Sequence, residues 1–517
     1  MNKLQSIKQD ALIALGTGVI LGAILAVVSP GNFLLGWLGA GIVSVLSVLG
    51  LLRAWRFIEG GKALAVLMTV AFLARIVLGI FLFLALPVLG FNNPVQNSGY
   101  VFSDAYERDQ AAFQMASSSE SWIGFLQQSR SSDQYGGLLM LSAVMYQVFS
   151  PDIHRPLVVV MFSAFIMTMG LPFLFGAVKK RWGIETAFFA GWVYALYPDG
   201  LLLGSSQMRE PFLIGLACIA FWASLFWKEK PVYAGLVSFS TLAIASLFSI
   251  PAGLAVLAVL AGVVFLDWMS QQKDRRAKIV GLTGFIIFIG IVSFAGWMWL
   301  KNTIYYDAYL TEASSGWITA LLDQIGEKYR IPFITLYGFT QPVLPAALVD
   351  PSLPIWMGIA IFRALGWYIV LPFILYGFFA LLNPGKLEHK NLLLWFSFVF
   401  AAWLLVSSLR AGGDQWDNPR YRTLFLPWMA IVVGWVLQRI QDKKSPWFWR
   451  WVAVEVVFVL FFLNWYINRH VLIGTQIPFF LMIELILIIS GIIFIGGFVW
   501  DKKRSPKKTA VSDLKNE

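Results

Sequence analysis

The chain has 517 residues, of which 58% are hydrophobic and only 13% are charged. That charged fraction is about half of what soluble domains carry, and so few charges cannot shield 43 Phe and 23 Trp residues from water. The apolar stretches are continuous rather than alternating, which excludes a transmembrane β-barrel. The net charge of +11 does not indicate nucleic-acid binding, because the basic residues sort by side of the membrane. The composition therefore predicts an all-α polytopic membrane protein.

Apolar runs long enough to cross a bilayer predict about 12 to 14 transmembrane helices. The first run is interpreted as an uncleaved helix, because it lacks a small-residue cleavage site and a second run follows at once. Two runs separated only by Pro251 are the weakest and are expected to form a tight or re-entrant hairpin. The predicted spans are 11–28, 33–52, 63–89, 157–178, 186–204, 211–227, 231–250, 252–266, 279–300, 355–382, 391–409, 423–438, 451–468 and 478–500.

The distribution of basic residues predicts the orientation. With the N-terminus inside, about two-thirds of the 39 Lys and Arg residues fall on inner segments, as the positive-inside rule expects. This predicts a multi-pass protein of the cytoplasmic membrane with both termini in the cytoplasm and a basic inner face that contacts anionic lipid. Residues 1–500 are expected to form one transmembrane domain with large outer loops at 91–155 and 301–354, followed by a polar cytoplasmic tail at 501–517.

The first outer loop carries an acidic cluster and an apolar segment. Residues 136–150 are too short to span the bilayer and are expected to form a helix at the outer surface. Asp104, Glu107, Arg108 and Asp109 follow the third predicted span closely. A carboxylate among like charges can serve as a general base, so Asp104 and Asp109 are catalytic candidates. The alternative is a solvated acidic loop without chemistry.

Two further polar clusters lie on the same predicted side. Arg209 and Glu210 precede Pro211, which suits the first turn of a helix, and an acid there also has a purely structural role in the field of the helix dipole. Farther on, Arg420 and Arg422 flank Tyr421 and could hold a phosphate. The alternative for these two arginines is anchoring at the membrane interface.

Other polar groups give weaker signals. Arg75 and Arg363 lie inside predicted spans, where a charge is costly; Arg75 is expected to pair within the bundle and Arg363 to snorkel toward the outer surface. The sequence has one cysteine and three histidines, without the spacing of a zinc site. No metal site is therefore predicted, and any bound cation would have to use carboxylates.

These clusters, in this order and on one side, resemble the GT-C superfamily of membrane glycosyltransferases. The strings Asp104-Ala105-Tyr106-Glu107-Arg108-Asp109, Tyr197-Pro198 with Arg209-Glu210, and Pro419-Arg420-Tyr421-Arg422 resemble the bacterial branch related to protein O-mannosyltransferases and aminoarabinose transferases. The resemblance extends from the third span to Arg422. It implies a GT-C-like helical fold with surface helices in the first large outer loop.

The resemblance also implies a reaction and site roles. The expected function is transfer of a sugar from a polyprenyl-phosphate donor to a glycan, lipid or protein acceptor on the outer face. Asp104, or Asp109, would be the base, and Glu210 the second acid. Some members use a divalent cation near the first acid. The implied substrate-binding residues are Glu107, Arg108, Arg209, Arg420, Tyr421 and Arg422, of which Arg420 and Arg422 would hold the lipid phosphate.

Other functions fit the same composition. A flippase or transporter of lipid-linked oligosaccharides would usually show internal repeats and polar residues at the membrane midplane, and we find neither. A polysaccharide polymerase or ligase also has large outer loops, so the sequence separates it poorly from a simple glycosyltransferase. A non-enzymatic assembly protein would not need three polar clusters on one face.

Overall fold

The computed structural model is all-helical over the part of the chain it describes, which is residues 3–118, 124, 136–313, 316–382, 389–443, 445–470 and 474–504. Within these residues, 11 helices are long and apolar enough to cross a membrane. A twelfth span is added if α19 (Asp417–Thr423) and α20 (Leu426–Lys443), which meet at a bend of 73°, cross together. The chain is a multi-pass membrane protein, and the 11 or 12 candidate spans among its described residues lie just below or at the lower limit of the predicted 12 to 14.

Every predicted span overlaps a helix, although the spans 186–204 and 423–438 each cross a break between two helices. The weak hairpin consists of two full-length helices, α11 and α12, joined at Ser249, whose hydroxyl accepts a hydrogen bond from the Ala252 amide in the first turn of α12. The long helices besides α20 are α1 (Lys3–Val28), α2 (Phe33–Phe57), α3 (Lys62–Leu89), α8 (Pro156–Leu196), α10 (Glu210–Ser224), α11 (Pro231–Phe248), α12 (Ile250–Met269), α13 (Arg275–Ala313), α17 (Pro354–Leu382), α18 (Lys390–Ala411), α21 (Pro446–His470) and α22 (Phe479–Arg504).

Helix α8 contains the predicted span 157–178 and the first part of the predicted span 186–204, whose remainder lies in α9 after a break at Tyr197. The chain reverses at Gly183, whose φ of 88° lies in the left-handed region that favours glycine. The Tyr194 hydroxyl donates a 2.6 Å hydrogen bond to the Met167 carbonyl, and a straight helix would separate these residues by about 40 Å. The two halves of α8 are therefore antiparallel, and they form the centre of the bundle by packing against α2, α3, α10 and α20.

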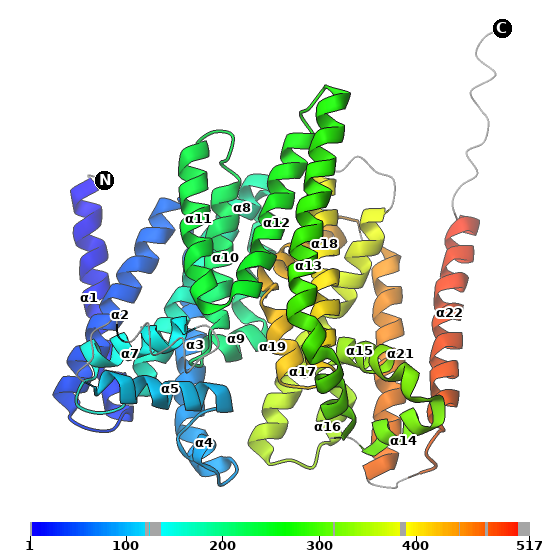
Figure 1. The fold of residues 1–517 in the computed structure, drawn as a ribbon, viewed down its shortest axis with the longest axis horizontal. Coiled ribbons are helices and arrows are strands. Elements are labelled where there is room, and N and C mark those ends of the chain that lie inside the picture. Colours follow the sequence, from blue (N-terminus) through cyan, green and yellow to red (C-terminus); the bar gives the residue numbers. More distant parts are fainter. Residues whose placement is uncertain are drawn as a thin grey trace.

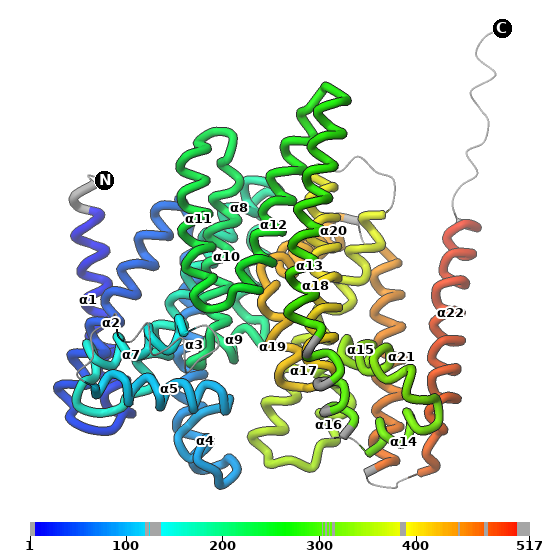
Figure 2. The backbone as a smooth tube through the Cα atoms, in the orientation of Figure 1, coloured from blue at the N-terminus to red at the C-terminus, as the bar shows by residue number. Residues whose placement is uncertain are grey.

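Short helices gather toward one end of the bundle, whereas α1 begins and α22 ends at the other (Figures 1 and 2). We call the end that carries α4, α5, α14 and α16 the loop end. Helix α7 matches the surface helix predicted at 136–150. The short elements besides α19 are α4 (Pro94–Asn97), α5 (Ser103–Ala116), α7 (Gly137–Phe149), α9 (Pro198–Gly204), α14 (Gly316–Ile325), the 3₁₀ turn at Glu327–Tyr329, α15 (Arg330–Thr340) and α16 (Leu344–Val349).

Two predicted regions are described only in part. Residues 119–123 and 125–135 of the first loop, and the predicted tail beyond Arg504, lie outside the described residues. Helix α22 extends a few residues past the predicted start of that tail at residue 501. Helices α4, α5 and α7 of the first loop are described, and α5 carries the acidic cluster.

Candidate functional site

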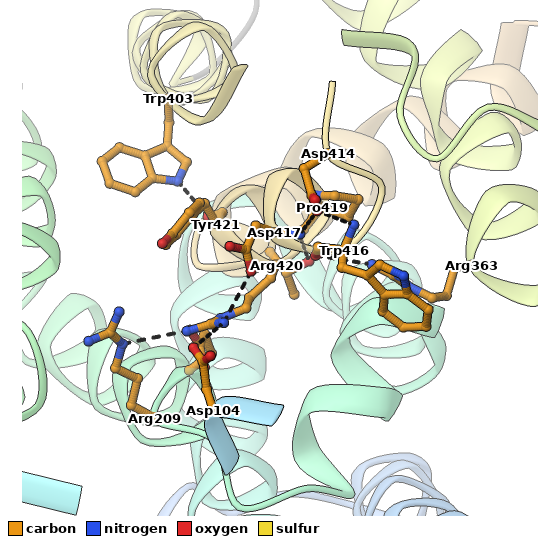
Figure 3. A network of polar contacts seen from close by, with 12 residues as sticks. Asp104, Arg209, Arg363, Trp403, Asp414, Trp416, Asp417, Pro419, Arg420 and Tyr421 are labelled. Atoms are coloured by element: carbon orange, nitrogen blue, oxygen red, sulfur yellow. Dashed lines mark hydrogen bonds and ion pairs between the residues drawn. The ribbon is translucent and has the colours of Figure 1, made fainter. Parts of the chain in front are cut away.

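Three polar clusters that are far apart in the sequence meet at one arginine. The Arg420 Nη1 atom lies 3.0 Å from Asp104 Oδ2 and 3.2 Å from Asp417 Oδ1, and its Nε lies 2.7 Å from Glu210 Oε1. These carboxylates come from α5, from the start of α10 and from the first turn of α19 (Figure 3). Because the Arg420 side chain is only 4% exposed, its charge is balanced almost entirely by these three groups.

Local sequence features hold Asp417, Glu210 and Arg420 in place. The Asp414 carboxylate accepts hydrogen bonds of 2.6 Å from the amides of Trp416 and Asp417, which fixes the turn that begins α19. Glu210 begins α10 with Pro211 beside it, as predicted, and is 1% exposed. The buried carboxylate and the rigid turn together aim Arg420 toward Asp104.

A cavity of about 450 Å³ opens beside the Asp104–Arg420 contact. Its volume suits a small polar substrate. The wall combines carboxylates with aromatic rings, a combination that can bind both hydroxyl groups and the apolar faces of sugar rings. The lining residues include Phe91, Gln96, Phe102, Asp104, Asp350, Trp356, Asp414, Trp416, Asp417 and Arg420.

Arg363 packs against Trp416, one of the aromatic residues that line this cavity. The Trp416 ring packs edge-on against Trp356 at 5.2 Å between centroids, and the Arg363 guanidinium lies 4.4 Å from the Trp416 ring centre. Arg363 Nε donates a 2.5 Å hydrogen bond to Asp199 Oδ1. The prediction that Arg363 snorkels toward solvent is wrong: it is 2% exposed, because the α9 carboxylate and the indole satisfy its charge inside the bundle.

Arg75, the other intramembrane arginine, is fully buried, and its charge is met by backbone rather than by an acid. Its guanidinium donates to the carbonyls of Ala71 and Tyr194. Among the described residues, no ion pair joins it to a carboxylate. The predicted pairing within the bundle therefore takes the form of one hydrogen bond within α3, to Ala71, and one from α3 to α8, to Tyr194.

Asp109 lies away from the cavity. Its carboxylate accepts 2.6 Å hydrogen bonds from the hydroxyls of Tyr100 and Tyr146, and His154 Nε2 lies 2.9 Å from it. Asp109 is 2% exposed, so the cluster connects α5 to α7 and to the segment before α8. Of the two aspartates, only Asp104 lines the cavity. The hydrogen bonds of Asp109 instead hold α5 in place.

Asp109→Asn should lower the stability of the fold rather than change the chemistry of the cavity. The amide keeps the shape of the side chain, but it cannot accept all three contacts as well as a carboxylate. We expect a loss of about 1–3 kcal/mol in the free energy of unfolding, measured as a lower melting temperature in detergent. Gln114→Ala, an exposed change on the same helix, is the control and should leave the melting temperature unaltered; an equally stable Asp109→Asn protein would contradict the role in holding α5.

Neighbouring charges separate the pKa values of the two aspartates at Arg420. Burial opposes ionisation of Asp104, but the Arg420 guanidinium, with Arg108 and Arg209, outweighs it and lowers the pKa of Asp104 below its ordinary 3.8. Burial raises the pKa of Asp417, and the carboxylates of Asp414, Asp104 and Glu210 add to this against the opposing effect of Arg420. Asp104 is therefore ionised at neutral pH, and the pKa of Asp417 lies above its ordinary value.

The lowered pKa of Asp104 gives a testable pH dependence of stability. Its ion pair contributes above the unfolded pKa of about 3.8 and is lost as the pH falls through the lower folded value. The difference in melting temperature between the wild type and Asp104→Asn should thus be constant from about pH 5 to 8 and shrink below about pH 4. A difference that disappears nearer pH 6 would mean that Asp104 has a raised pKa instead.

A second, apolar recess lies on the other side of Arg420. It is lined by Arg209, Glu210, Leu213, Ser249, Pro251, Ala252, Trp299, Trp403, Tyr421 and Leu424, and its free volume is only about 20 Å³. The Trp403 Nε1 atom donates a 2.8 Å hydrogen bond to the Tyr421 carbonyl (Figure 3). The Arg410 guanidinium lies 5.6 Å from the ring centres of both Trp299 and Tyr421. Arg209 thus lines this recess, and Arg410 lies against two of its aromatic rings.

Three of the predicted site residues, Arg422, Glu107 and Arg108, do not line the cavity. Arg422 is 1% exposed, lies 3.5 Å from the Trp367 ring centre and donates to the Gln341 carbonyl, so it does not reach the cavity. Glu107 points to the exposed side of α5. Arg108 contributes to the field at Asp104 without lining the cavity. The structure thus brings together Asp104, Glu210, Arg209, Arg420 and Tyr421.

Sequence reasoning missed much of the cavity. Asp350 and Trp356 come from the end of the second large loop and the start of α17, and Gln96 comes from α4. No motif marks any of them. The available signal was weak: an Asp and a Trp flanking Pro354 at a predicted membrane interface, where aromatic residues are common for other reasons.

The carboxylates at Arg420 do not fit a divalent cation. Asp104 and Asp417 each direct an oxygen to the same guanidinium nitrogen, so a positive charge already lies between these two carboxylates. Across the described ranges, no group of three or more His, Cys, Asp or Glu side chains is arranged to hold a metal ion. No metal-dependent step follows from this site.

Comparisons with known proteins add little to this description. The chain matches no protein-family model and no curated protein. Among solved structures it is similar to the archaeal oligosaccharyltransferase AglB from Archaeoglobus fulgidus, in complex with an inhibitory peptide and a dolichol-phosphate, at 12% identity and a TM-score of 0.33. The match covers 83% of this chain and 55% of the other, so the chain spans about half the length of AglB. A likeness at this level does not establish a shared fold.

Proposed function

We propose that the protein is a membrane glycosyltransferase that moves a sugar from a polyprenyl-phosphate-linked donor to a hydroxyl group of a glycan, lipid or protein acceptor. The observation that carries the proposal is the meeting of Asp104 and Arg420 beside a cavity with carboxylate and aromatic walls, with an arginine-bordered apolar recess behind. A reaction between a lipid-borne phosphate ester and a polar acceptor needs one polar and one apolar compartment that adjoin. The order of the sequence motifs supports the same class.

On the cavity side, Asp104 is suited to accept the proton of the acceptor hydroxyl. It is ionised at neutral pH, and its side chain is 52% exposed toward the cavity. Arg420 orients the carboxylate through one oxygen and leaves the other available. The rings of Trp356 and Trp416 offer an apolar surface against which a sugar ring can stack.

On the recess side, Arg209 and Arg410 are suited to the phosphate of the donor. When the bond from the anomeric carbon to the phosphate oxygen breaks, the electron pair stays on the phosphate, and cations held nearby stabilise that charge. Arg420 is a poorer candidate for this role than the motif implies, because three carboxylates already neutralise it. Because the free volume of the recess is only about 20 Å³, its lining has to move before a phosphate can enter.

The reaction assigned to these groups is a single displacement. The acceptor oxygen forms the new bond to the anomeric carbon as the phosphate leaves, and the hydroxyl proton passes to Asp104. We place the site on the outer face of the cytoplasmic membrane, because the basic residues predict that orientation. The loop end of the bundle would then face outward.

Reconstitution tests the function directly. Purified protein in liposomes should move radiolabelled sugar from a polyprenyl-phosphate-linked donor to a soluble hydroxyl acceptor, and the product should not form in protein-free liposomes. A flippase would carry the intact lipid-linked sugar across the bilayer without breaking its phosphate bond. Movement of the donor without transfer would therefore reject the glycosyltransferase in favour of that alternative.

A further inference from the structure

An apolar groove lies at the end of the bundle opposite the candidate site. It measures about 640 Å³ and is formed by α1, α2 and α8. Both the start of α1 and the end of α2 lie at this end (Figure 1). Its lining residues are Ser6, Gly50, Arg53, Ala54, Arg56, Phe57, Met169 and Phe173.

The walls of the groove are apolar and wide open to the surroundings of the bundle. The Phe57 ring is 56% exposed and lies 6.3 Å from the Phe173 ring and 5.3 Å from Trp222. Gly50 forms the floor, where any larger side chain would strike Phe165 and Met169 within about 3 Å. Gly50 therefore lets α2 and α8 approach closely at this point, and the open groove beside this contact has a volume within the range that holds small molecules.

Two arginines and one buried aspartate stand at the rim. Arg56 binds both carboxylate oxygens of Asp10 at 2.6 to 2.8 Å, whereas Arg53 makes one looser ion pair with it at 3.5 Å. Asp10 is fully buried and the Arg53 side chain is 40% exposed. Two positive charges thus face one negative charge, and the surplus resides on Arg53 beside the groove.

We propose that this groove binds one anionic phospholipid of the surrounding bilayer, with its phosphate against Arg53 and an acyl chain against Phe57, Met169 and Phe173. An apolar groove with a surplus cation at its rim has the two features that such a lipid combines. A zwitterionic lipid would fit the groove equally well but would gain less from Arg53, because its headgroup carries its own positive charge. The proposal does not depend on the glycosyltransferase activity.

Native mass spectrometry of the full chain tests this with phosphatidylglycerol and phosphatidylcholine that carry the same acyl chains. The wild type should retain one phosphatidylglycerol in preference to phosphatidylcholine. Arg53→Ala should weaken phosphatidylglycerol binding about fivefold and leave phosphatidylcholine binding unchanged. Arg276→Ala is the matched control, because Arg276 is an exposed arginine on α13 at the same end of the bundle.

Two further variants and one soluble competitor distinguish a lipid-binding site from a basic surface without an apolar groove. Phe57→Ala should weaken both lipids, because it removes a wall of the groove. Arg53→Lys should keep the preference, which separates loss of charge from loss of fold. Equal losses in Arg53→Ala and Arg276→Ala would reduce the effect to general surface charge and overturn the proposal. Competition by soluble glycerol phosphate as effective as that by the lipid would also overturn it, because the apolar groove would then contribute nothing.

Discussion

Asp104→Asn should lower sugar transfer about a thousandfold while the protein remains folded. Asn has the same shape and can still contact Arg420, but it cannot take up the acceptor proton, and a positioned general base contributes about 10² to 10⁴ in rate. Because Asp104 is half-exposed, the substitution buries no new unpaired charge. The measurement is the initial rate of transfer from the polyprenyl-phosphate donor in liposomes.

The control for this prediction comes from the same helix. Glu107→Gln removes a carboxylate that is exposed and does not line the cavity, so it should transfer at nearly the wild-type rate. Melting temperatures of both variants show whether any loss reflects unfolding. An Asp104→Asn protein with a rate close to that of Glu107→Gln would remove Asp104 from the chemistry and leave the cavity without a base.

The helices could be predicted from sequence because hydrophobicity alone dictates them. A run of about 20 apolar residues has no stable alternative to a helix in a bilayer, and each predicted run is helical over most of its length. Even the reversal within α8 at Gly183 was implied, since two spans flank the basic cluster Lys179-Lys180-Arg181. Only the number of full-length spans was less certain, because α10 is short and α19–α20 is bent.

The candidate site could be predicted only in part, because its chemistry depends on which groups become neighbours. Asp104, Glu210 and Arg420 were each identified from local motifs. Nothing in those motifs shows that one guanidinium would bind several carboxylates. Local sequence also gave Asp109 the same standing as Asp104, whereas the tertiary fold surrounds Asp109 with phenols and an imidazole. Pairing between distant helices is decided by packing, which a single sequence does not record.

The neighbours of Arg420 change the expected effect of its substitution from weaker donor binding to lower stability. The motif alone predicts that Arg420→Ala mainly weakens donor binding. In the structure, the same change leaves Glu210 as a buried carboxylate without its closest partner. Removing one member of a buried ion pair costs about 3–5 kcal/mol, a large part of the roughly 5–15 kcal/mol that stabilises a typical domain.

We therefore expect Arg420→Ala to melt far below the wild type, as followed by tryptophan fluorescence in detergent. Arg209→Ala is the control, because Arg209 lies 3.8 Å from Glu210 and its removal leaves the Arg420–Glu210 contact intact. Arg420→Met combined with Glu210→Gln should regain part of the lost stability, since no charge then remains buried alone. If Arg420→Ala instead melts like the wild type and only raises the KM for the donor, Arg420 binds the lipid phosphate directly and is not the structural centre of this site.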